Sequence, residues 1–279
     1  PIPGRPPRLH KPQIPRLKRI LLRGPGAIGY STELWTLQRI AQLIEKEFGV
    51  RYHIGHVWKV MSQELGWSCQ KPERRATQRD EKAIERWKKT TWPAIKKNRT
   101  LGAHLAFLDE SGFLLISNVR RTWAPSGKTP ILRHSYKRDR ISAISSITVS
   151  PRRRRMGLYV HLYPDNITGQ EVSLFLRDLL QHIRGDVVLL WDGGPIHRTA
   201  LVKTFLDQHS RLHIYRFPSY APELNPDESV WTKAKCDLSN SAPKDIRSLD
   251  MLLCASLRRI RGSQSMLRSC IASSELPWR

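Results

Sequence analysis

Three acidic residues stand where a folded chain could bring their side chains together. One apolar run ends in Asp109, and a second ends in Asp192, directly before a Gly-Gly-Pro turn. Short apolar runs that end in an acid and a turn are typical of buried strands that deliver a carboxylate to the edge of a sheet. Glu228 precedes an amphipathic run at 229–236. Three converging carboxylates predict a site for divalent metal ions that act on phosphates.

Phosphodiester chemistry explains why three acids would be needed. Two Mg²⁺ ions about 4 Å apart can hold the attacking and the leaving oxygen together. Mg²⁺ keeps several of its waters, so it needs only a few carboxylates from the protein. We expect Asp109 and Asp192 to hold the pair of ions, and Glu228 to complete the ligand shell of one. No nucleophilic side chain is required, because water or a 3′ hydroxyl attacks the phosphorus.

Three motifs resemble those of a known family, the DDE superfamily endonuclease core of bacterial insertion-sequence transposases. The most similar group is related to the mariner superfamily and is numbered six-thirty among insertion sequences. The motifs are Leu108-Asp109-Glu110-Ser111-Gly112, Trp191-Asp192-Gly193-Gly194-Pro195-Ile196-His197-Arg198 and Pro222-Glu223-Leu224-Asn225-Pro226-Asp227-Glu228. The interval from Asp192 to Glu228 is also close to the spacing of this group. The resemblance implies that Asp109, Asp192 and Glu228 are both the catalytic residues and the metal ligands.

The resemblance also implies an activity, a cofactor and partners. The activity is cut-and-paste transposition, in which DNA is cleaved at the element's terminal inverted repeats and joined to target DNA at a TA dinucleotide. The cofactor is Mg²⁺, with two ions and with Mn²⁺ as a substitute. Double-stranded DNA is the partner, a homodimer forms in the active complex, and the place of action is the nucleoid in the bacterial cytoplasm. Asp227 departs from the family, which usually has an apolar residue there, and would add negative charge beside the site.

Each acid also has a structural interpretation. Strand-end aspartates often cap turns, and a glutamate at a helix N-terminus interacts favourably with the helix dipole. Glu110 is left outside the triad because it should point to the opposite face of its strand, and Glu223 because it precedes the helix. His197 is interpreted as a hydrogen-bonded loop histidine, and contact with a phosphate or assistance to the reaction is the alternative. Two other functions stay open: a catalytically inactive DNA-binding remnant or regulator, and a ribonuclease-H-like, structure-selective nuclease.

The composition favours a polyanionic partner. Lys and Arg number 48 against 24 Asp and Glu in 279 residues, a formal net charge of +24. With no apolar stretch long enough to cross a membrane, this surplus indicates nucleic acid. Four scattered cysteines form no Cys-x-x-Cys pair, which predicts reduced thiols and argues against zinc. No signal peptide is visible, and the start at Pro1 leads us to expect that an N-terminal portion is absent.

The first part of the chain predicts a basic linker at 1–30. Its prolines favour an extended chain, and Arg5 and Arg8 could follow phosphates or enter a narrow minor groove. A plain solvated linker explains the same composition equally well.

Residues 31–75 predict a small all-α domain of the helix-turn-helix or winged-helix type. Two amphipathic runs are separated by Gly49, with Ser31 or Thr32 placed to cap the first helix and 66–71 as a wing. The second helix would present three basic side chains to DNA: His53, His56 and Lys59. The alternative is a helical bundle that packs against another part of the protein.

The remaining chain predicts a charged connecting helix at 76–100, which Pro93 is expected to kink, and an α/β catalytic domain at 101–279. The predicted strands lie at 104–109, 113–116, 119–123, 141–149, 157–162, 187–191 and 212–217. The predicted helices begin at the capping box of Thr168 and at 199, 229 and 249. Early strands, a helix, and then alternating strands and helices are typical of a ribonuclease-H-like core, a mixed sheet flanked by helices. In the strand numbering of that fold, Asp109 lies on the first strand and Asp192 at the end of the fourth.

Other basic residues predict further DNA contacts. Arg152, Arg153 and Arg154 belong to a run of arginines at the tip of a predicted hairpin, where each neutralised phosphate would make binding salt-dependent. A disordered charged turn is the alternative. Lys233 and Lys235 are candidate phosphate contacts of low specificity.

Overall fold

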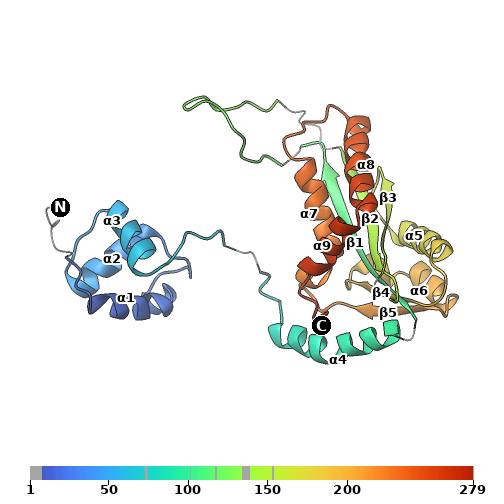
Figure 1. Ribbon diagram of the computed structural model, residues 1–279, viewed down its shortest axis with the longest axis horizontal. Coiled ribbons are helices and arrows are strands. Elements are labelled where there is room, and N and C mark those ends of the chain that lie inside the picture. Colours follow the sequence, from blue (N-terminus) through green and yellow to red (C-terminus); the bar gives the residue numbers. More distant parts are fainter. Residues whose placement is uncertain are drawn as a thin grey trace. The chain divides into compact units, whose positions relative to one another are not determined.

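Apolar side chains form separate cores in the N-terminal part of the chain and in the rest of it. The computed structural model describes residues 8–72, 75–100, 102–116, 118–133, 139–152 and 154–278. The chain divides into an N-terminal unit, Pro1–Arg74, and a C-terminal unit, Arg75–Arg279, whose elements are labelled in Figure 1. Among the described helices, none is both long and apolar enough to cross a membrane.

The N-terminal unit consists of short helices around one apolar core. In chain order these are α1 (Gln13–Leu22), the 3-10 turn η1 (Gly26–Ile28), α2 (Leu37–Phe48), α3 (Ile54–Lys59) and the π-helical turn η2 (Val60–Glu64). The buried residues of this core are Leu9, Leu17, Leu21, Ile40, Leu43, Ile44, Val57, Val60, Met61 and Leu65. Every α-helix of the unit therefore contributes to a single core.

Helix α1 shows that the chain is helical at residues 13–22, where the linker prediction expected an extended chain, and residues 1–7 of the predicted linker lie outside the described residues. Pro12 is its N-cap residue and Pro15 lies in its first turn, where backbone N–H groups have no helical partner and proline is tolerated. Leu17 and Leu21 are four residues apart, lie on one face of the helix and are 0% and 1% exposed. The burial of this face stabilises a helix in a proline-rich sequence.

Helix α2 begins later than predicted. Thr36 caps it by accepting a backbone hydrogen bond, so the cap is neither Ser31 nor Thr32. Gly49 ends the helix with a φ of 67°, a left-handed conformation that glycine adopts without a Cβ clash, and this confirms the predicted break. Residues 66–71, predicted as a wing, contain no strand.

A long helix opens the C-terminal unit. α4 (Glu81–Thr100) begins after Asp80, whose side chain caps its first turn, and so starts later than predicted. Pro93 lies inside the helix, which continues to Thr100. The side chains of Trp92 and Ile95 are buried in the core beside the sheet.

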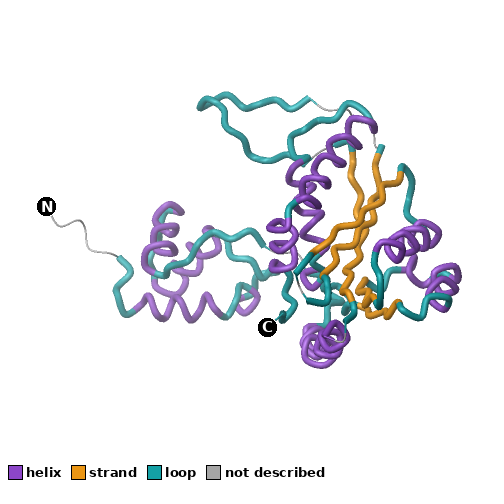
Figure 2. The backbone as a smooth tube through the Cα atoms, turned by 45° about the vertical axis from the view of Figure 1, so that its right-hand side comes forward, coloured by secondary structure: helices purple, strands orange, loops and turns teal. Residues whose placement is uncertain are grey.

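A five-stranded mixed sheet is the centre of the C-terminal unit. Its strands are β1 (His104–Leu114), β2 (Arg140–Val149), β3 (Met156–Tyr163), β4 (Val187–Trp191) and β5 (Leu212–Arg216). The spatial order is β3-β2-β1-β4-β5. β2 pairs antiparallel with β1 and β3, whereas β4 pairs parallel with β1 and β5. All residues of β4 are buried, because helices cover both faces of the sheet (Figure 2).

Strand β1 is longer than predicted. The chain runs as one strand through the predicted turn after Asp109, so this residue lies inside β1 and pairs with Ser145 of β2. The strand predicted at 119–123 is not formed, and Trp123 is 99% exposed there. The β propensity of this segment does not produce a strand because no neighbouring strand pairs with it.

Alternate residues of β1 face two layers of helices. Ala106 and Leu108 belong to the core on the side of α5 (Gly169–His182) and α6 (Ala200–Asp207). Leu105 and Phe107 belong to the core on the side of α4 and of three later helices, α7 (Asp227–Asp237), α8 (Ile246–Gly262) and α9 (Gln264–Ser273). The capping box at Thr168 is formed as predicted, whereas α9 was not predicted.

Candidate active site

The three acids singled out by the sequence line one pocket. Asp109 comes from β1, Asp192 follows β4, and Glu228 lies in the first turn of α7, around a volume of about 400 Å³. β1 and β4 are neighbouring parallel strands, so residues toward their carboxyl ends lie in the same region of the sheet. The fold therefore brings together acids from three distant parts of the chain.

The acids share this pocket without forming a preformed three-ligand cluster. Among the described residues, no three His, Cys, Asp or Glu side chains stand close enough together to hold one metal ion. Asn225 and Arg198 also line the pocket. The pocket thus combines carboxylates with an amide and a guanidinium.

Asp109 has the most perturbed electrostatics of the three acids. Its Oδ2 is buried and has no hydrogen-bond partner among the described residues. Burial raises the pKa of Asp109 to about 9, and repulsion from Glu228, Asp227, Glu110 and Asp192 acts in the same direction. A divalent cation would stabilise the ionised form in these surroundings. The free carboxylate oxygen and the all-oxygen donor set therefore fit a hard ion such as Mg²⁺.

A buried imidazole joins Asp192 to the opposite face of β1. His197, in the 3-10 turn η3 (Pro195–Arg198), is 2% exposed and stacks on Trp191 with 4.3 Å between ring centroids. Its Nδ1 lies 3.0 Å from Asp192 Oδ1, and its Nε2 lies 3.0 Å from Glu110 Oε1. Burial lowers the pKa of His197, but the hydrogen bonds to both acids raise it to about 9. His197 is therefore an imidazolium that donates to two carboxylates.

The turn after β4 fixes Asp192 as well. The Gly194 N–H donates to Asp192 Oδ1 at 2.8 Å, and a Cβ at position 194 would stand only 2.9 Å from that oxygen, which explains the glycine. The hydrogen bond from His197 lowers the pKa of Asp192, although burial opposes it. The Asp192 side chain is 63% exposed. Because Oδ1 accepts the bonds described here, Oδ2 is the oxygen available to a ligand.

Asn225 and Asp227 attach the start of α7 to the sheet. Asn225 Nδ2 donates to the Leu108 carbonyl oxygen at 3.1 Å, and its Oδ1 accepts from the Asp227 N–H at 3.2 Å. Asp227 is 0% exposed and accepts a hydrogen bond from Ser145 Oγ. Burial raises the pKa of Asp227 well above its usual value. The charge of Asp227 acts on Asp109, as expected for an extra acid beside the site, while its own burial opposes ionisation.

Glu228 follows on the same turn of α7. Burial raises the pKa of Glu228, the charge of Lys235 opposes the shift, and Asp192 adds to it. Lys235 is therefore the lysine whose charge reaches the pocket. The charge of Lys233 acts instead on Asp237 and Cys270. The sequence alone does not distinguish the two lysines, because both lie on the same short helix.

The residues most easily confused with the site are engaged elsewhere. Glu110 points to the other face of β1, as predicted, and bonds to His197. Glu223 accepts two hydrogen bonds from Arg79. Trp231 is 0% exposed and packs against Phe113, so it belongs to the core rather than to the site.

The candidate DNA contacts of the N-terminal unit lie at exposed positions. The described ones are Arg8, His53, His56 and Lys59. The His53 side chain also caps α3 by accepting from the Gly55 N–H, and the His56 ring packs on Tyr52 with 4.2 Å between centroids. Arg5 lies outside the described residues.

The arginine run lies in the turn between β2 and β3, which confirms the predicted hairpin. The Ser150 N–H donates to the Arg155 carbonyl oxygen at 3.0 Å. Arg152 and Arg154 are exposed, and Arg153 lies outside the described residues.

A larger cavity, of about 780 Å³, lies along β3 and α5. Its lining includes Arg155, Arg184 and Arg261 but only one carboxylate, that of Asp178. The acids are gathered in the smaller pocket, so the chemistry of the lining residues, rather than size, locates the candidate site.

Comparisons with protein families agree with this organisation. The model of a family described as DDE superfamily endonuclease matches residues 104–250, a range that contains all three pocket acids. A model described as winged helix-turn helix matches residues 31–91. No protein of curated function matches the chain.

Several solved structures share the fold at low sequence identity. The crystal structure of a pre-cleavage Mos1 transpososome is 16% identical, with a TM-score of 0.64 over 98% of this chain and 81% of that chain. The Mos1 strand transfer complex is 17% identical, with a TM-score of 0.63 over 100% and 82%. The mariner Mos1 paired end complex with Mg is 18% identical, with a TM-score of 0.60 over 98% and 81%. These comparisons confirm the predicted fold, a ribonuclease-H-like core that follows a small helical domain in the sequence.

Proposed function

Because the chain belongs to the DDE superfamily of endonucleases, we propose that it is a DNA transposase. It cleaves DNA at the terminal inverted repeats of its own element and transfers the freed strands into target DNA. The observation that carries the proposal is the pocket shared by Asp109, Asp192 and Glu228, in which a buried oxygen of Asp109 has no partner among the described residues. The fold shared with Mos1 transposase complexes supports it.

Asp109, Asp192 and Glu228 are the residues that would hold Mg²⁺, with two ions in the active complex and Mn²⁺ as a substitute. Bound there, the ions would activate the attacking hydroxyl and stabilise the charge on the leaving oxygen. The mariner Mos1 paired end complex contains Mg, which supports the choice of ion. Nothing in the pocket needs to act as a covalent nucleophile.

The reaction consists of two displacements at phosphorus. Water first attacks the phosphodiester at the element's end, the P–O3′ bond breaks, and a 3′ hydroxyl is set free. That hydroxyl then attacks a target phosphodiester and replaces the target's own 3′ oxygen. During both steps His197 and Gly194 hold Asp192 in place. Arg198, which lines the pocket, is placed to hold a phosphate oxygen through its N–H groups.

Duplex DNA is the proposed partner of both units. In the N-terminal unit, Arg8, His53, His56 and Lys59 would contact the terminal repeat, as would Arg5. On the C-terminal unit, Arg152, Arg153 and Arg154 would follow a phosphate backbone, with Lys233 as a weaker contact. The net charge of +24 supports this assignment.

We further propose that the chain comes from a bacterial insertion sequence of the group numbered six-thirty. It would act on the nucleoid in the cytoplasm, pair two element ends as a homodimer, and insert at TA dinucleotides. The three quoted motifs and the shared fold support this finer assignment.

Cleavage and joining of labelled DNA that carries the terminal repeats test the proposal. The wild type is compared with Asp192→Asn in Mg²⁺ and then in Mn²⁺. We expect metal-dependent cutting and a joined product with the wild type, and neither with the variant. Cutting without joining would favour a structure-selective nuclease instead.

An inactive DNA-binding remnant is the second candidate, because the three acids do not form a preformed three-ligand cluster among the described residues. Salt-sensitive binding to the terminal repeat, with no cutting by the wild type in either metal, is the result that would favour it.

A further inference from the structure

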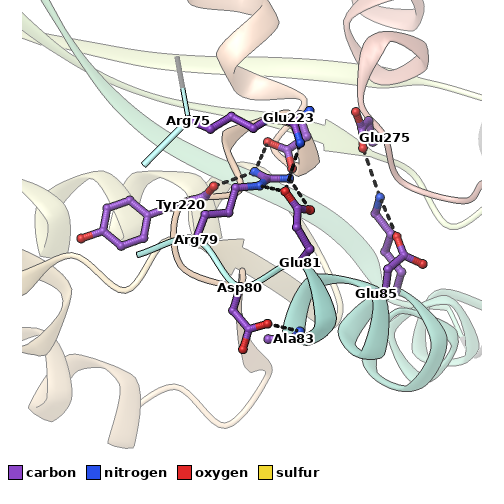
Figure 3. Close-up of polar contacts among 10 residues, drawn as sticks. Arg75, Arg79, Asp80, Glu81, Ala83, Glu85, Tyr220, Glu223 and Glu275 are labelled. Atoms are coloured by element: carbon purple, nitrogen blue, oxygen red, sulfur yellow. Dashed lines mark hydrogen bonds and ion pairs between the residues drawn. The ribbon is translucent and has the colours of Figure 1, made fainter. Parts of the chain in front are cut away.

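A partly buried arginine outside the acidic pocket holds the loop that leads to Glu228. Arg79 lies just before α4, and its side chain is 9% exposed. Its guanidinium donates to both carboxylate oxygens of Glu223, at 2.9 and 2.6 Å, and to the Tyr220 carbonyl oxygen at 2.7 Å. Two more bonds, at 2.7 and 3.2 Å, go to Glu81. Figure 3 shows Arg79 at the centre of this cluster.

The segment bound by Arg79 is a wall of the acidic pocket. Tyr220, Ala221 and Pro222 line the pocket together with the three acids. Tyr220 has a φ of 57°, a left-handed conformation that residues with a Cβ rarely adopt. Such a conformation persists only where surrounding contacts hold it. Arg79 supplies one of those contacts, because it binds the carbonyl group of Tyr220 itself.

Backbone hydrogen bonds connect this wall to Glu228. The Asn225 N–H donates to the Pro222 carbonyl oxygen at 2.9 Å, which closes the 3-10 turn η4 (Pro222–Leu224). The Glu228 N–H donates to the Asn225 carbonyl oxygen at 3.2 Å. Two backbone hydrogen bonds therefore connect the loop that Arg79 binds to Glu228.

We propose that Arg79 is a positioning residue for Glu228, which fixes the η4 loop and so sets where the third carboxylate stands toward the metal ions. The inference rests on the proposed function, since Arg79 acts only through Glu228. Asn225 holds the same loop from the other side through its bond to Leu108 of β1. The arginine and the asparagine together anchor the start of α7 to α4 and to the sheet.

The number of bonds explains why this residue is an arginine. A guanidinium has five N–H donors in a fixed fork, and here all of them are used, two on Glu223, two on Glu81 and one on Tyr220. Lysine has a compact charge without this planar geometry and cannot reproduce the fork. Burial raises the pKa of Glu223, but the hydrogen bond from Arg79, a backbone hydrogen bond and the charges of Arg79 and Lys88 together lower it below its usual value.

Helix α4 provides a matched control pair. Lys88 donates to Glu275 at 3.1 Å, and its side chain is 17% exposed. This ion pair joins α4 to the C-terminal segment, where Figure 3 labels Glu275, and neither residue lines the pocket. The Glu275 N–H also donates to the Glu223 carbonyl oxygen at 2.9 Å, a backbone bond that does not involve the Lys88 side chain. Removing Lys88 thus breaks an α4 ion pair but leaves this bond and the Arg79 bonds to the loop intact.

The test compares the full chain as wild type, Arg79→Met, Arg79→Lys and Lys88→Met on DNA with the terminal repeat. We expect Arg79→Met to lower kcat for cleavage about 10- to 100-fold and to raise the Mg²⁺ concentration for half-maximal cleavage, as loss of an outer-shell partner does. The KM for DNA should not change. The kcat of Arg79→Lys should lie between that of the wild type and that of Arg79→Met. The kcat of Lys88→Met should stay within about twofold of the wild type.

A second readout does not depend on cleavage. The Mn²⁺ affinity of each protein without DNA is measured from the electron paramagnetic resonance signal of the free ion. We expect it to weaken in Arg79→Met and Arg79→Lys but not in Lys88→Met. If Arg79→Met does not fold, the kcat and the Mn²⁺ affinity of Arg79→Lys decide whether Arg79 has the proposed role.

Two results would overturn the role of Arg79. One is wild-type kcat and Mn²⁺ affinity in Arg79→Lys or in a folded Arg79→Met. The other is a raised KM for DNA with an unchanged kcat, which would make Arg79 a DNA contact. If the wild type cleaves no DNA in either Mg²⁺ or Mn²⁺, the proposed function is wrong instead. The Mn²⁺ affinities of the variants then still test the positioning role of Arg79.

Discussion

The acidic pocket and the candidate DNA contacts differ in how the chain holds their side chains. In the pocket, hydrogen bonds cross between elements, from His197 to Asp192 and Glu110 and from Asn225 to β1. Candidate contacts such as Lys59 and Arg152 are exposed at the surface. Metal ligands must be held in a fixed geometry by a supporting shell, whereas contacts to a phosphate backbone tolerate variable geometry. The two regions should therefore respond differently to mutation.

The largest effect is expected from Asp109→Asn. Loss of this carboxylate removes a proposed metal ligand and should lower cleavage on the order of 10³-fold or more, as removal of a catalytic group does. Mg²⁺ should also stop raising Tm, because an ion that binds only the folded state stabilises it. The measurements are single-turnover cleavage and thermal unfolding with and without Mg²⁺. If Asp109→Asn cleaves DNA at the wild-type rate, Asp109 is not a catalytic residue.

The same variant has a pH signature in metal-free protein. The pKa of Asp109 is about 9 in the folded state, against an ordinary value of 3.8. Between these values the folded state binds a proton that the unfolded state lacks, so stability falls as pH rises from about 4 to 9. We expect Asp109→Asn to remove this penalty and to have a Tm above that of the wild type, by a margin that grows with pH.

A smaller effect is expected from His197→Asn, since His197 acts on Asp192, a proposed metal ligand, rather than on the metal. Cleavage should fall about 10- to 100-fold, the usual cost of losing an outer-shell partner. The matched control is His213→Asn, because His213 forms an exposed pair with Asp186 at 3.7 Å. An equal loss in both variants would show that the buried bridge has no special role.

The His197 bridge has its own pH dependence. Its pKa is raised from 6.5 to about 9 in the folded state, so its contribution to stability is complete below pH 6.5 and is lost as pH rises through 9. Removing the imidazole should flatten the fall of Tm over this window. A Tm profile that keeps the wild-type slope would contradict the assignment.

Local patterns in the sequence predicted much of the fold and the identity of the pocket acids. The apolar run that forms β4 and the capping box at Thr168 are each encoded within a few residues, so the sequence alone reveals them. Asp109 was misplaced at a strand end because Ser111 and Gly112 indicate a turn. Pairing with β2 continues the strand through both residues, and that partner is not visible from β1.

Contacts between distant residues could not be predicted in the same way. His197 bonds to Glu110 across 87 positions, and Arg79 bonds to Glu223 across 144. Neither residue type nor local spacing marks such a pair. The sequence therefore identified the acids that face the pocket, but not the side chains that support them.

The basic surface should give a graded, salt-dependent effect. In the double variant Arg152→Ala, Arg154→Ala, the slope of log affinity against log salt should fall by about 0.9 for each phosphate that is no longer neutralised. Cleavage of fully bound DNA should stay near the wild-type rate. The matched control is Arg177→Ala, Lys203→Ala, which removes the same charge from exposed positions on α5 and α6. Equal slopes in the two double variants would mean that net charge, not this turn, attracts DNA.

The smallest effect on activity is expected from Asp227→Asn, although Asp227 adjoins Glu228. Burial raises the pKa of Asp227, so an uncharged group is favoured there, and asparagine is uncharged, similar in shape and able to accept from Ser145. Cleavage should stay within about threefold, a change of roughly 0.6 kcal/mol. Ser145→Ala removes the donor and should lower the free energy of unfolding by about 1 kcal/mol. A loss of cleavage as large as that in Asp109→Asn would instead indicate that Asp227 is ionised and binds metal. The start of α7 would then provide two metal ligands, Asp227 and Glu228, rather than one ligand and one supporting residue.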